Sequence, residues 1–386
     1  MANYAVTTAG TALEFDTQDA TRNNCFTIDE NHFINFYTGV TTHGFAQAFA
    51  VDTSTWAITT ANSKFEFDTQ FNQQNSCWQV DTNHFINFWQ GGPFALPGHS
   101  GLAQILEVDT STWAVTTAAT RLEFDTESNA YNYCCKIDTN HFINFWAGSA
   151  SPFPSFTQVF EVDTSTWAVT TANSSLEFES NNVEGGTCSL VDANHVISFW
   201  NGADNDGFTQ IFEINTTTWA VTTAAASLEF DTVLASGNSC FQIDDNHVIN
   251  FWRGDGGDGF TQVFTINTSN WTVTTAATRL EFDTQNSLRN SCYQVDSNHF
   301  ISFWAGLDND GYTQVFEVDT STWAVTTTSS WLEFDTQYGV DNSCSTIDTS
   351  HYINFWKGVD NDGFAQIFTV DVPAPAATDT GFFLMF

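Results

Sequence analysis

The sequence predicts an all-β fold, a seven-bladed β-propeller of four-stranded antiparallel blades, and three observations support this. A ten-residue segment, VDTSTWAVTT, occurs unchanged at 108–117, 162–171 and 318–327 and slightly altered at 51–60, 214–223 and 266–275. A histidine in segments of the type NHFINFW recurs at spacings of 52, 57, 54, 52, 52 and 52 residues, and such periods are typical of repeat architectures. The units are rich in Phe, Val, Ile, Trp and Thr and are broken by Asp, Asn, Ser and Gly, which favours short strands and tight turns.

Four strands are expected in each unit. In the sixth copy they are Ser291–Val295, His299–Trp304, Tyr312–Val318 and Trp323–Thr327. The LEFDTQ segment at 332–337 is expected to carry the chain to the next unit. Seven such sheets arranged radially leave only short, protected edges.

The two ends of the chain predict how the ring closes. Residues 3–8 read NYAVTT and match TWAVTT, with Tyr4 in the place of the tryptophan. The last unit stops after its third strand, Phe364–Val370, and has no such segment of its own. The N-terminal strand, residues 3–9, is therefore predicted to complete the seventh blade and to remove an unpaired edge. This gives a propeller domain over 1–371 and a Pro/Ala linker with an apolar tail over 372–386.

The composition excludes several classes of function. Forty-five acidic and eight basic residues give a net charge of −37. A nucleic-acid partner is not expected, because binding phosphates requires a basic surface. Membrane insertion is not expected, since no apolar run approaches the roughly 20 residues that span a bilayer. The first 15 residues lack the pattern of a secretory signal, so synthesis in a cytoplasm is expected.

The repeats resemble a known family. FEVDTSTW and YQVDSNHFISFWAG, both present in the sixth unit, resemble parts of the kelch repeat, in which an Asp-bearing turn leads to a tryptophan and a later hairpin ends in glycine. The resemblance covers all seven units and implies a kelch-type propeller. Trp304-Ala305-Gly306 stands where the family has a glycine pair, and the family's arginine is absent. The units also resemble uncharacterised propeller repeats of marine phage and bacterial proteins.

Variable loops indicate a candidate binding face. The connections after the second and fourth strands differ in length among copies and lie on one face of an antiparallel blade. Loops on a rigid scaffold often carry binding residues. Residues in or beside these loops that depart from the repeat are Pro93, Phe94, Pro97, His99, Phe153, Arg253 and Lys357.

Acidic turns raise the question of a metal. Four connections after the second strand carry two carboxylates and a glycine, a chemistry that suits calcium. Their acidic residues are Asp204, Asp206, Asp255, Asp258, Asp308, Asp310, Asp360 and Asp362. An ordinary Asp/Asn/Gly turn is the favoured interpretation and calcium the alternative, so no cofactor is expected to be required. The seven repeated histidines and seven repeated cysteines are interpreted as structural, because a single reaction centre needs residues that break the symmetry.

The chain ends in an apolar segment, Phe382, Phe383, Leu384, Met385 and Phe386. It is expected to fold back on the propeller or to dock on another structural subunit. No nucleophile, phosphate loop or metal motif indicates an enzyme. The leading expectation is a non-enzymatic virion component, on a particle or an extracellular surface, that contacts a host glycan or protein or neighbouring subunits. The alternatives are a lectin-like propeller, a hydrolase or lyase on a propeller scaffold, and an intracellular kelch-like interaction scaffold.

Overall fold

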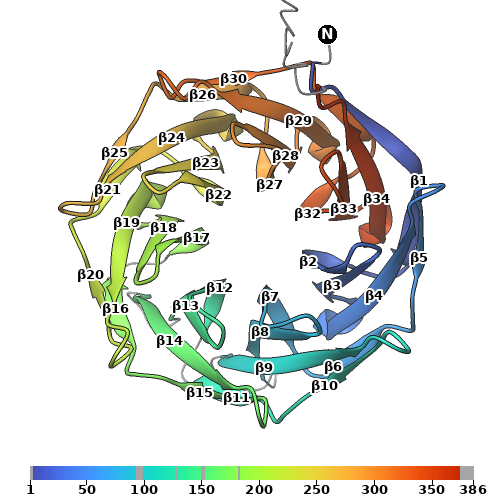
Figure 1. Ribbon diagram of the computed structural model, residues 1–386, viewed down its shortest axis with the longest axis horizontal. Helices are drawn as coiled ribbons and strands as arrows, with labels where there is room; N and C mark the ends of the chain where they lie inside the picture. Colours follow the sequence, from blue (N-terminus) through green and yellow to red (C-terminus); the bar gives the residue numbers. More distant parts are fainter. Residues whose placement is uncertain (1–2, 93–98, 127–128, 149–152, 181–182, 374–386) are drawn as a thin grey trace, which may run out of the picture.

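The computed structural model describes residues 3–92, 99–126, 129–148, 153–180 and 183–373. They form seven antiparallel sheets around a central axis (Figure 1). The fold class predicted from the repeats, an all-β seven-bladed propeller, is confirmed. No helix among the described residues has the length and apolar character needed to cross a bilayer.

In six blades the strands run outward from the axis in chain order, and in the seventh the first three strands do so. The innermost strands are β2 (Thr21–Asp29), β7 (Asn72–Gln79), β12 (Ala130–Lys136), β17 (Glu184–Asp192), β22 (Ser236–Asp244), β27 (Leu288–Gln294) and β32 (Val340–Thr346). The second strands are β3 (His32–Thr38), β8 (His84–Gly91), β13 (His141–Ala147), β18 (His195–Asn201), β23 (His247–Arg253), β28 (His299–Ala305) and β33 (His351–Lys357). The third strands are β4 (Gly44–Asp52), β9 (Ser100–Asp109), β14 (Ser155–Asp163), β19 (Gly207–Ile214), β24 (Gly259–Asn267), β29 (Gly311–Val318) and β34 (Gly363–Val370).

In six blades the outermost strand is divided into two pieces, both paired with the third strand. The first pieces are β5 (Ala57–Thr60), β10 (Ala114–Thr117), β15 (Ala168–Thr171), β20 (Val221–Thr223), β25 (Thr272–Thr275) and β30 (Val325–Thr327). The second pieces are β6 (Phe65–Asp68), β11 (Leu122–Asp125), β16 (Leu176–Glu179), β21 (Leu228–Asp231), β26 (Leu280–Asp283) and β31 (Leu332–Asp335). The expectation that LEFDTQ only connects units is therefore wrong. In the first blade, Thr60 pairs with Phe49 and Phe65 with Ala46, so both pieces extend one ladder on either side of a bulge.

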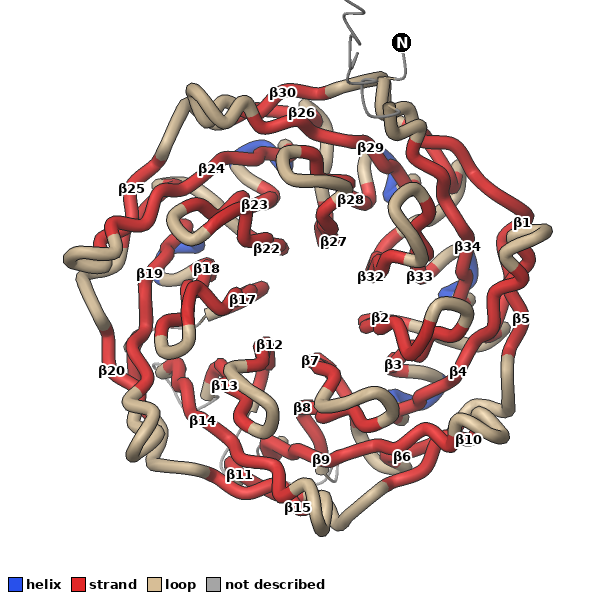
Figure 2. Tube along the Cα trace, in the orientation of Figure 1, coloured by secondary structure: helices blue, strands red, loops and turns tan. Residues whose placement is uncertain are grey.

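The N-terminal strand closes the ring, as predicted. β1 (Val6–Asp16) pairs antiparallel with β34, from Val6 opposite Val370 to Asp16 opposite Gly363, and so completes the seventh blade. Figure 2 shows β1 lying along β34 at the outside of the ring. Because β1 pairs with β34, the third strand of the last blade has a partner on both sides and leaves no unpaired edge.

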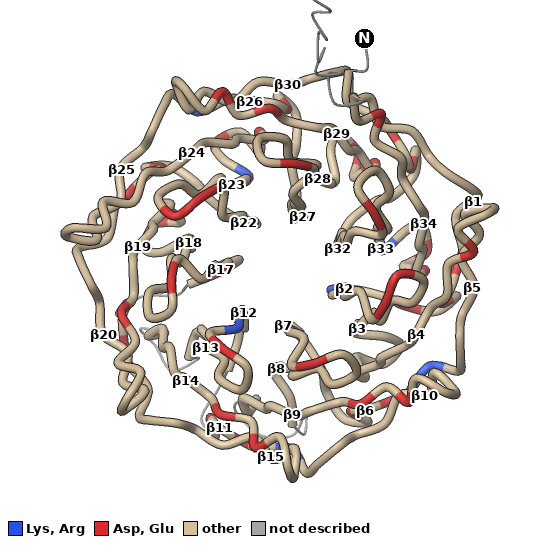
Figure 3. The backbone as a smooth tube through the Cα atoms, viewed as in Figure 1, with Lys and Arg blue, Asp and Glu red and all other residues tan. Residues whose placement is uncertain are grey.

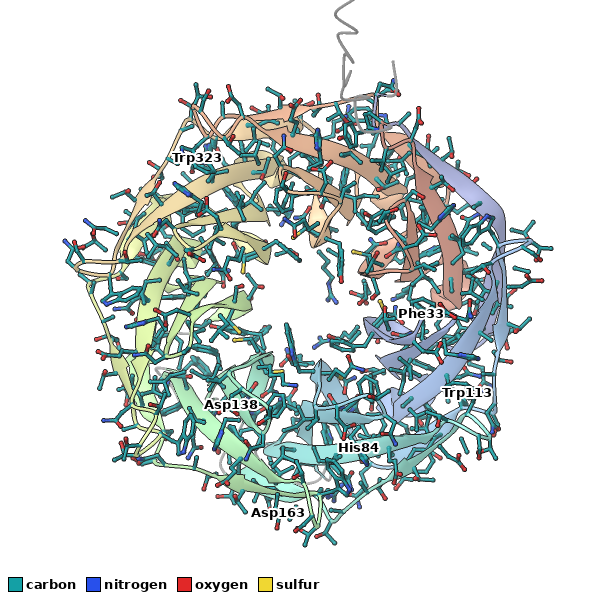
Figure 4. All side chains as sticks on the ribbon, viewed as in Figure 1. Phe33, His84, Trp113, Asp138, Asp163 and Trp323 are labelled. Carbon is teal, nitrogen blue, oxygen red and sulfur yellow. The ribbon has the colours of Figure 1, made fainter. Side chains whose placement is uncertain are left out.

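An Asp–His–aromatic contact joins each blade to the next. An aspartate three residues earlier orients the repeated histidine through its Nδ1. The histidine ring stacks on an aromatic ring of the following blade. The His84 and Trp167 rings are 3.5 Å apart, and His84 Nδ1 lies 2.9 Å from an Asp81 oxygen. Tyr4 takes the tryptophan's place at the closure and stacks on His299 at 3.7 Å. The structural interpretation of the seven histidines is thus supported by their contacts. Figure 4 places two of these tryptophans, Trp113 and Trp323, near the outer rim.

The apolar core lies between the blades. Each cluster combines residues of two neighbouring sheets; Phe49 of β4 and Phe355 of β33, for example, lie 4.9 Å apart in the cluster that joins the first and seventh blades. The middle residues of the second strands, such as Phe33 and Ile34, are fully buried because both faces of the sheet are covered. The blades therefore form a rigid frame around the axis.

Within the described ranges, five short 3₁₀ turns follow second strands on one face of the ring. They are η1 (Val40–Thr42), η2 (Ala203–Asn205), η3 (Asp255–Gly257), η4 (Leu307–Asn309) and η5 (Val359–Asn361).

Candidate functional site

A cavity of about 1190 Å³ surrounds the axis and is lined by the seven innermost strands. Figure 1 shows these strands facing one another across the centre. Although the chain is strongly acidic, Figure 3 shows basic positions on two of them, β2 and β12. A concave space bounded by several elements is the usual place for a small-molecule site.

A ring of seven equivalent residues, three positions before each repeated cysteine, directly precedes the residues that line one end of this cavity, such as Asn75, Asn132 and Gly186. We call it the channel ring: Arg22, Gln74, Tyr131, Gly185, Gly237, Arg289 and Asp341. All seven have φ between 51° and 61°. Each innermost strand breaks register with its neighbour at this point, for example between Thr21 and Asn24. Such bulges near a strand's end often redirect side chains at functional sites.

Neighbouring blades come close together at the channel ring. A Cβ atom on Gly185 would lie 2.9 Å from the backbone nitrogen of Gly237, so a larger residue there requires a shift. The Arg22 N–H donates to Asp341 Oδ2 of the preceding blade at 3.1 Å. The Tyr131 N–H likewise donates to the Gln74 side chain. Side chains of one blade thus hold the left-handed backbone of the next.

The channel ring carries an electrostatic network. The Asp341 carboxylate also pairs with the Arg289 guanidinium, and the two side chains are 5% and 51% exposed. Burial lowers the pKa of Arg22, and Arg289 lowers it further, whereas Asp341 and Tyr131 oppose the shift. Four of the seven positions therefore influence one another around the axis.

Glu184 completes this network beside the channel ring. Burial raises the pKa of Tyr131, and so do the charge of Glu184 and the hydrogen bond between the Tyr131 hydroxyl and the Glu184 carboxylate. Arg22 and Arg289 oppose that shift. The end of the cavity therefore holds two cations, two carboxylates and a phenol, a set that can polarise a carbonyl and position a water molecule.

Sequence reasoning missed this cluster. The signal was present, because one repeat position reads Arg, Gln, Tyr, Gly, Gly, Arg and Asp in successive copies while the cysteine three residues later never changes. What the sequence could not show was that this position faces the axis, since a bulge decides the direction of the side chain.

At the other end of the cavity, Lys136 has a structural role. Its Nζ donates to the carbonyl oxygens of Val80 and Gln79 at 2.6 and 3.3 Å. Burial lowers the pKa of Lys136. The lysine therefore links two innermost strands.

The repeated cysteines also link strands. All eight cysteines, each within the described part of the chain, are free thiols. The Cys25 N–H donates to Ser343 Oγ at 2.9 Å, and the equivalent bond joins Cys134 to Ser76. Burial raises the pKa of Cys25 to about 12. These contacts agree with their interpretation as small buried groups.

The binding-face residues predicted from the loops are distributed over several blades. His99 stacks on Phe71 at 4.1 Å, and burial lowers the pKa of His99. Phe153 is 43% exposed, and Lys357 lies 5.4 Å from the ring centre of Tyr338. Arg253 ends β23 opposite Gly259. Other predicted residues lie outside the described part of the chain: Pro93, Phe94, Pro97, Phe382, Phe383, Leu384, Met385 and Phe386. Their roles stay predictions.

The acidic turns are closed by their own backbone. In η2 the Asp206 N–H donates to the Ala203 carbonyl at 3.0 Å, and the Gly202 N–H donates to the Asp206 carbonyl at 2.9 Å. Asp204, between them, has φ 57°. Within the ranges that the structure describes, no three His, Cys, Asp or Glu side chains gather to hold a metal ion. Calcium binding at the turns stays a prediction.

Comparisons with known proteins identify the fold. No family model matches the chain, and no curated protein matches it. Among solved structures, the periplasmic gluconolactonase PpgL of Pseudomonas aeruginosa is similar, with a TM-score of 0.58, 11% identity and coverage of 83% of this chain and 86% of that one. A proposed 6-phosphogluconolactonase of Bacteroides uniformis has a TM-score of 0.56 and 10% identity, with coverage of 79% of this chain and 83% of that one. Sqt1 of Chaetomium thermophilum has a TM-score of 0.56 and 11% identity, with coverage of 92% of this chain and 83% of that one.

These comparisons correct the expected function. Two of these three propellers are described as lactonases, which contradicts the expectation of a non-enzymatic virion component and of no enzyme. That expectation depended on the absence of a sequence motif for catalysis. A propeller assembles its polar groups from different blades, and therefore needs no contiguous motif. The identities of 10–11% by themselves establish only the shared fold.

Proposed function

We propose that this protein is a hydrolase that opens lactone rings at the channel ring. The observation that carries the proposal is the convergence of Arg22, Tyr131, Arg289 and Asp341, with Glu184, at one end of the axial cavity. Most other repeat positions carry nearly the same residue in every blade, whereas a reaction centre requires different groups around one point. The similarity to propellers described as lactonases supports this choice of reaction.

The proposed chemistry assigns a role to each group. Glu184, oriented by the Tyr131 hydroxyl, accepts a proton from a water molecule as the water oxygen attacks the lactone carbonyl carbon. Arg22 and Arg289 stabilise the negative charge that develops on the carbonyl oxygen. The bond from the carbonyl carbon to the ring oxygen then breaks, and that oxygen takes the proton from Glu184. The product is an open-chain hydroxy acid.

Asp341 acts as a positioning residue in this scheme. Its carboxylate holds the Arg289 guanidinium and the Arg22 backbone at once, so it fixes the distance between the two cations. It also offsets the repulsion between them, which is one cause of the lowered pKa of Arg22.

The test is lactone hydrolysis above the spontaneous rate, followed by acid release at constant pH with glucono-δ-lactone and γ-butyrolactone. Arg289→Gln and Glu184→Gln are each expected to lower kcat/KM by about 10²-fold, the usual effect of losing one charge-stabilising group or one general base. Arg289→Gln introduces the residue that the second blade carries at this position, Gln74, so the variant is expected to fold.

Matched controls carry the same charge change away from the axis. Arg121→Gln removes an arginine whose guanidinium lies 3.5 Å from Asp68, and Glu30→Gln removes the charge of an exposed glutamate in a turn. Both controls are expected to keep the wild-type rate. No hydrolysis above background with either lactone, or equal losses in the controls, would overturn the proposal.

A further inference from the structure

Aromatic side chains line the middle of the axial cavity on two sides. They occupy the position directly after the repeated cysteine, which reads Phe26, Trp78, Cys135, Ser189, Phe241, Tyr293 and Ser345 around the ring. We call the four aromatic members the aromatic girdle: Phe26, Trp78, Phe241 and Tyr293. They come from β2 and β7 on one side and from β22 and β27 on the other, and Figure 1 shows these pairs facing each other across the axis. Small residues separate the two pairs.

The aromatic girdle is supported from behind. Phe26 lies 6.2 Å from Trp78 and 6.1 Å from Phe85, ring centre to ring centre. On the other side, Phe241 lies 5.7 Å from Tyr293 and 5.9 Å from Phe300. The outer surfaces of these rings are thus packed, while the half-buried remainder borders the cavity.

The seven side chains at this position offer few polar groups, namely the hydroxyls of Ser189, Tyr293 and Ser345, the Cys135 thiol and the Trp78 indole N–H. The Ser345 hydroxyl is already paired with Thr27 at 2.9 Å. The Tyr293 hydroxyl has no hydrogen-bond partner among the described residues, and burial raises its pKa. A sugar ring here would leave several hydroxyls unpaired, which costs free energy, whereas a flat apolar ring would need at most one hydrogen bond. This part of the cavity, at the aromatic girdle, therefore favours an aryl group over a sugar.

We propose that the aromatic girdle binds an uncharged planar aryl group, and that the substrate is a lactone carrying such a group on a side chain. This deepens the function proposed above and rests on it for the position of the lactone. The girdle lies four residues after the channel ring along each innermost strand, roughly 13 Å at about 3.3 Å per residue. A side chain of about that reach places the aryl ring in the girdle while the lactone lies at the channel ring.

The first experiment measures binding without turnover. Isothermal titration of 2-naphthol into the full-length protein is compared for wild type, Trp78→Ser, Phe241→Ser and Tyr293→Phe. Serine stands at this position in two blades, as Ser189 and Ser345, so both serine variants are expected to fold, which thermal melting checks. We expect Kd to rise about tenfold for each serine variant, as for the loss of one stacking partner, and a few-fold for Tyr293→Phe.

The control is Trp331→Ser, which removes a tryptophan that is 52% exposed on the surface. Its Kd for 2-naphthol is expected to equal that of wild type. No binding by wild type, unchanged Kd in both serine variants, or equal weakening in Trp331→Ser would each overturn the proposal.

The second experiment separates this inference from the proposed function. The kcat/KM for γ-butyrolactone bearing a phenylbutyl chain is compared with that for the unsubstituted lactone. Trp78→Ser is expected to raise KM about tenfold for the aryl lactone alone. Hydrolysis of both lactones with no preference for the aryl one refutes the girdle and leaves the hydrolase standing. Naphthol binding that the serine variants abolish, without hydrolysis, supports the girdle as an aryl site and refutes the hydrolase.

Discussion

Tyr4→Ala tests how the ring is held closed. In six blades a tryptophan stacks on the histidine of the preceding blade, and at the closure Tyr4 does so with His299. The Tyr4 hydroxyl also donates to Asp296 Oδ2 at 2.8 Å, whereas none of the six tryptophans that stack on histidines donates to an aspartate in the described part of the chain. Burial and then Asp296 raise the pKa of Tyr4 to about 12, so the phenol stays protonated at neutral pH.

The magnitude follows from these two contacts. A stacked aromatic pair contributes about 1 kcal/mol, and a half-exposed hydrogen bond to a carboxylate contributes about 1 kcal/mol more. The unfolding entropy of a domain of this size is about 0.8 kcal/mol/K, so a loss of about 2 kcal/mol lowers Tm by about 2.5 °C. Tyr4→Phe keeps the stack and is expected to lower Tm by about half as much.

The assay is calorimetric melting at pH 7 of wild type, Tyr4→Ala, Tyr4→Phe and Tyr4→Trp. The tryptophan variant restores the residue of the other six contacts and is expected to behave like Tyr4→Phe. If Tyr4→Ala melts at the wild-type temperature, the stack at the closure contributes nothing, and the argument for the other six contacts fails with it.

Two further outcomes are expected. In six blades the aromatic residue near the end of the second strand donates to an Asp carboxylate on the outer strand of the preceding blade, as Trp89 Nε1 does to Asp68. Glu179 of the third blade stands in that place for Trp200 of the fourth, and the Nε1 of the buried Trp200 has no partner within the described chain. Glu179→Asp is expected to raise Tm by about 1 °C, and no change in the melt would contradict this. Burial alone would raise the pKa of Asp138, but bonds from Asn140 and His141 outweigh it and lower the pKa below its ordinary 3.8. The Asp138 carboxylate therefore stabilises the fold fully above pH 3.8, and this stabilisation is lost as the pH falls below that value. The difference in Tm between wild type and Asp138→Ala should stay constant from pH 7 to 5 and shrink towards pH 2. A difference that persists at pH 2 would show that the charge of the carboxylate does not contribute to it.

The sequence by itself determined the architecture. Seven copies with a nearly constant period specify seven similar sheets, and the incomplete last copy, with its match at residues 3–8, specifies how the ring closes. Such features are local patterns of strands and turns, which a sequence states directly. The split outer strand was missed because the composition of LEFD suits a connection as well as a strand; only the pairing of both pieces with one third strand decides between them.

The candidate site depended on tertiary structure. Arg22, Arg289 and Asp341 are separated by up to 319 residues, and nothing in their neighbours' chemistry marks them as partners. Closure of the ring brings the first and seventh blades together, and the bulge at φ near 55° turns this repeat position towards the axis. The sequence therefore specified a symmetric arrangement of blades. Only the tertiary structure showed which of the residues that differ between copies lie close enough to interact.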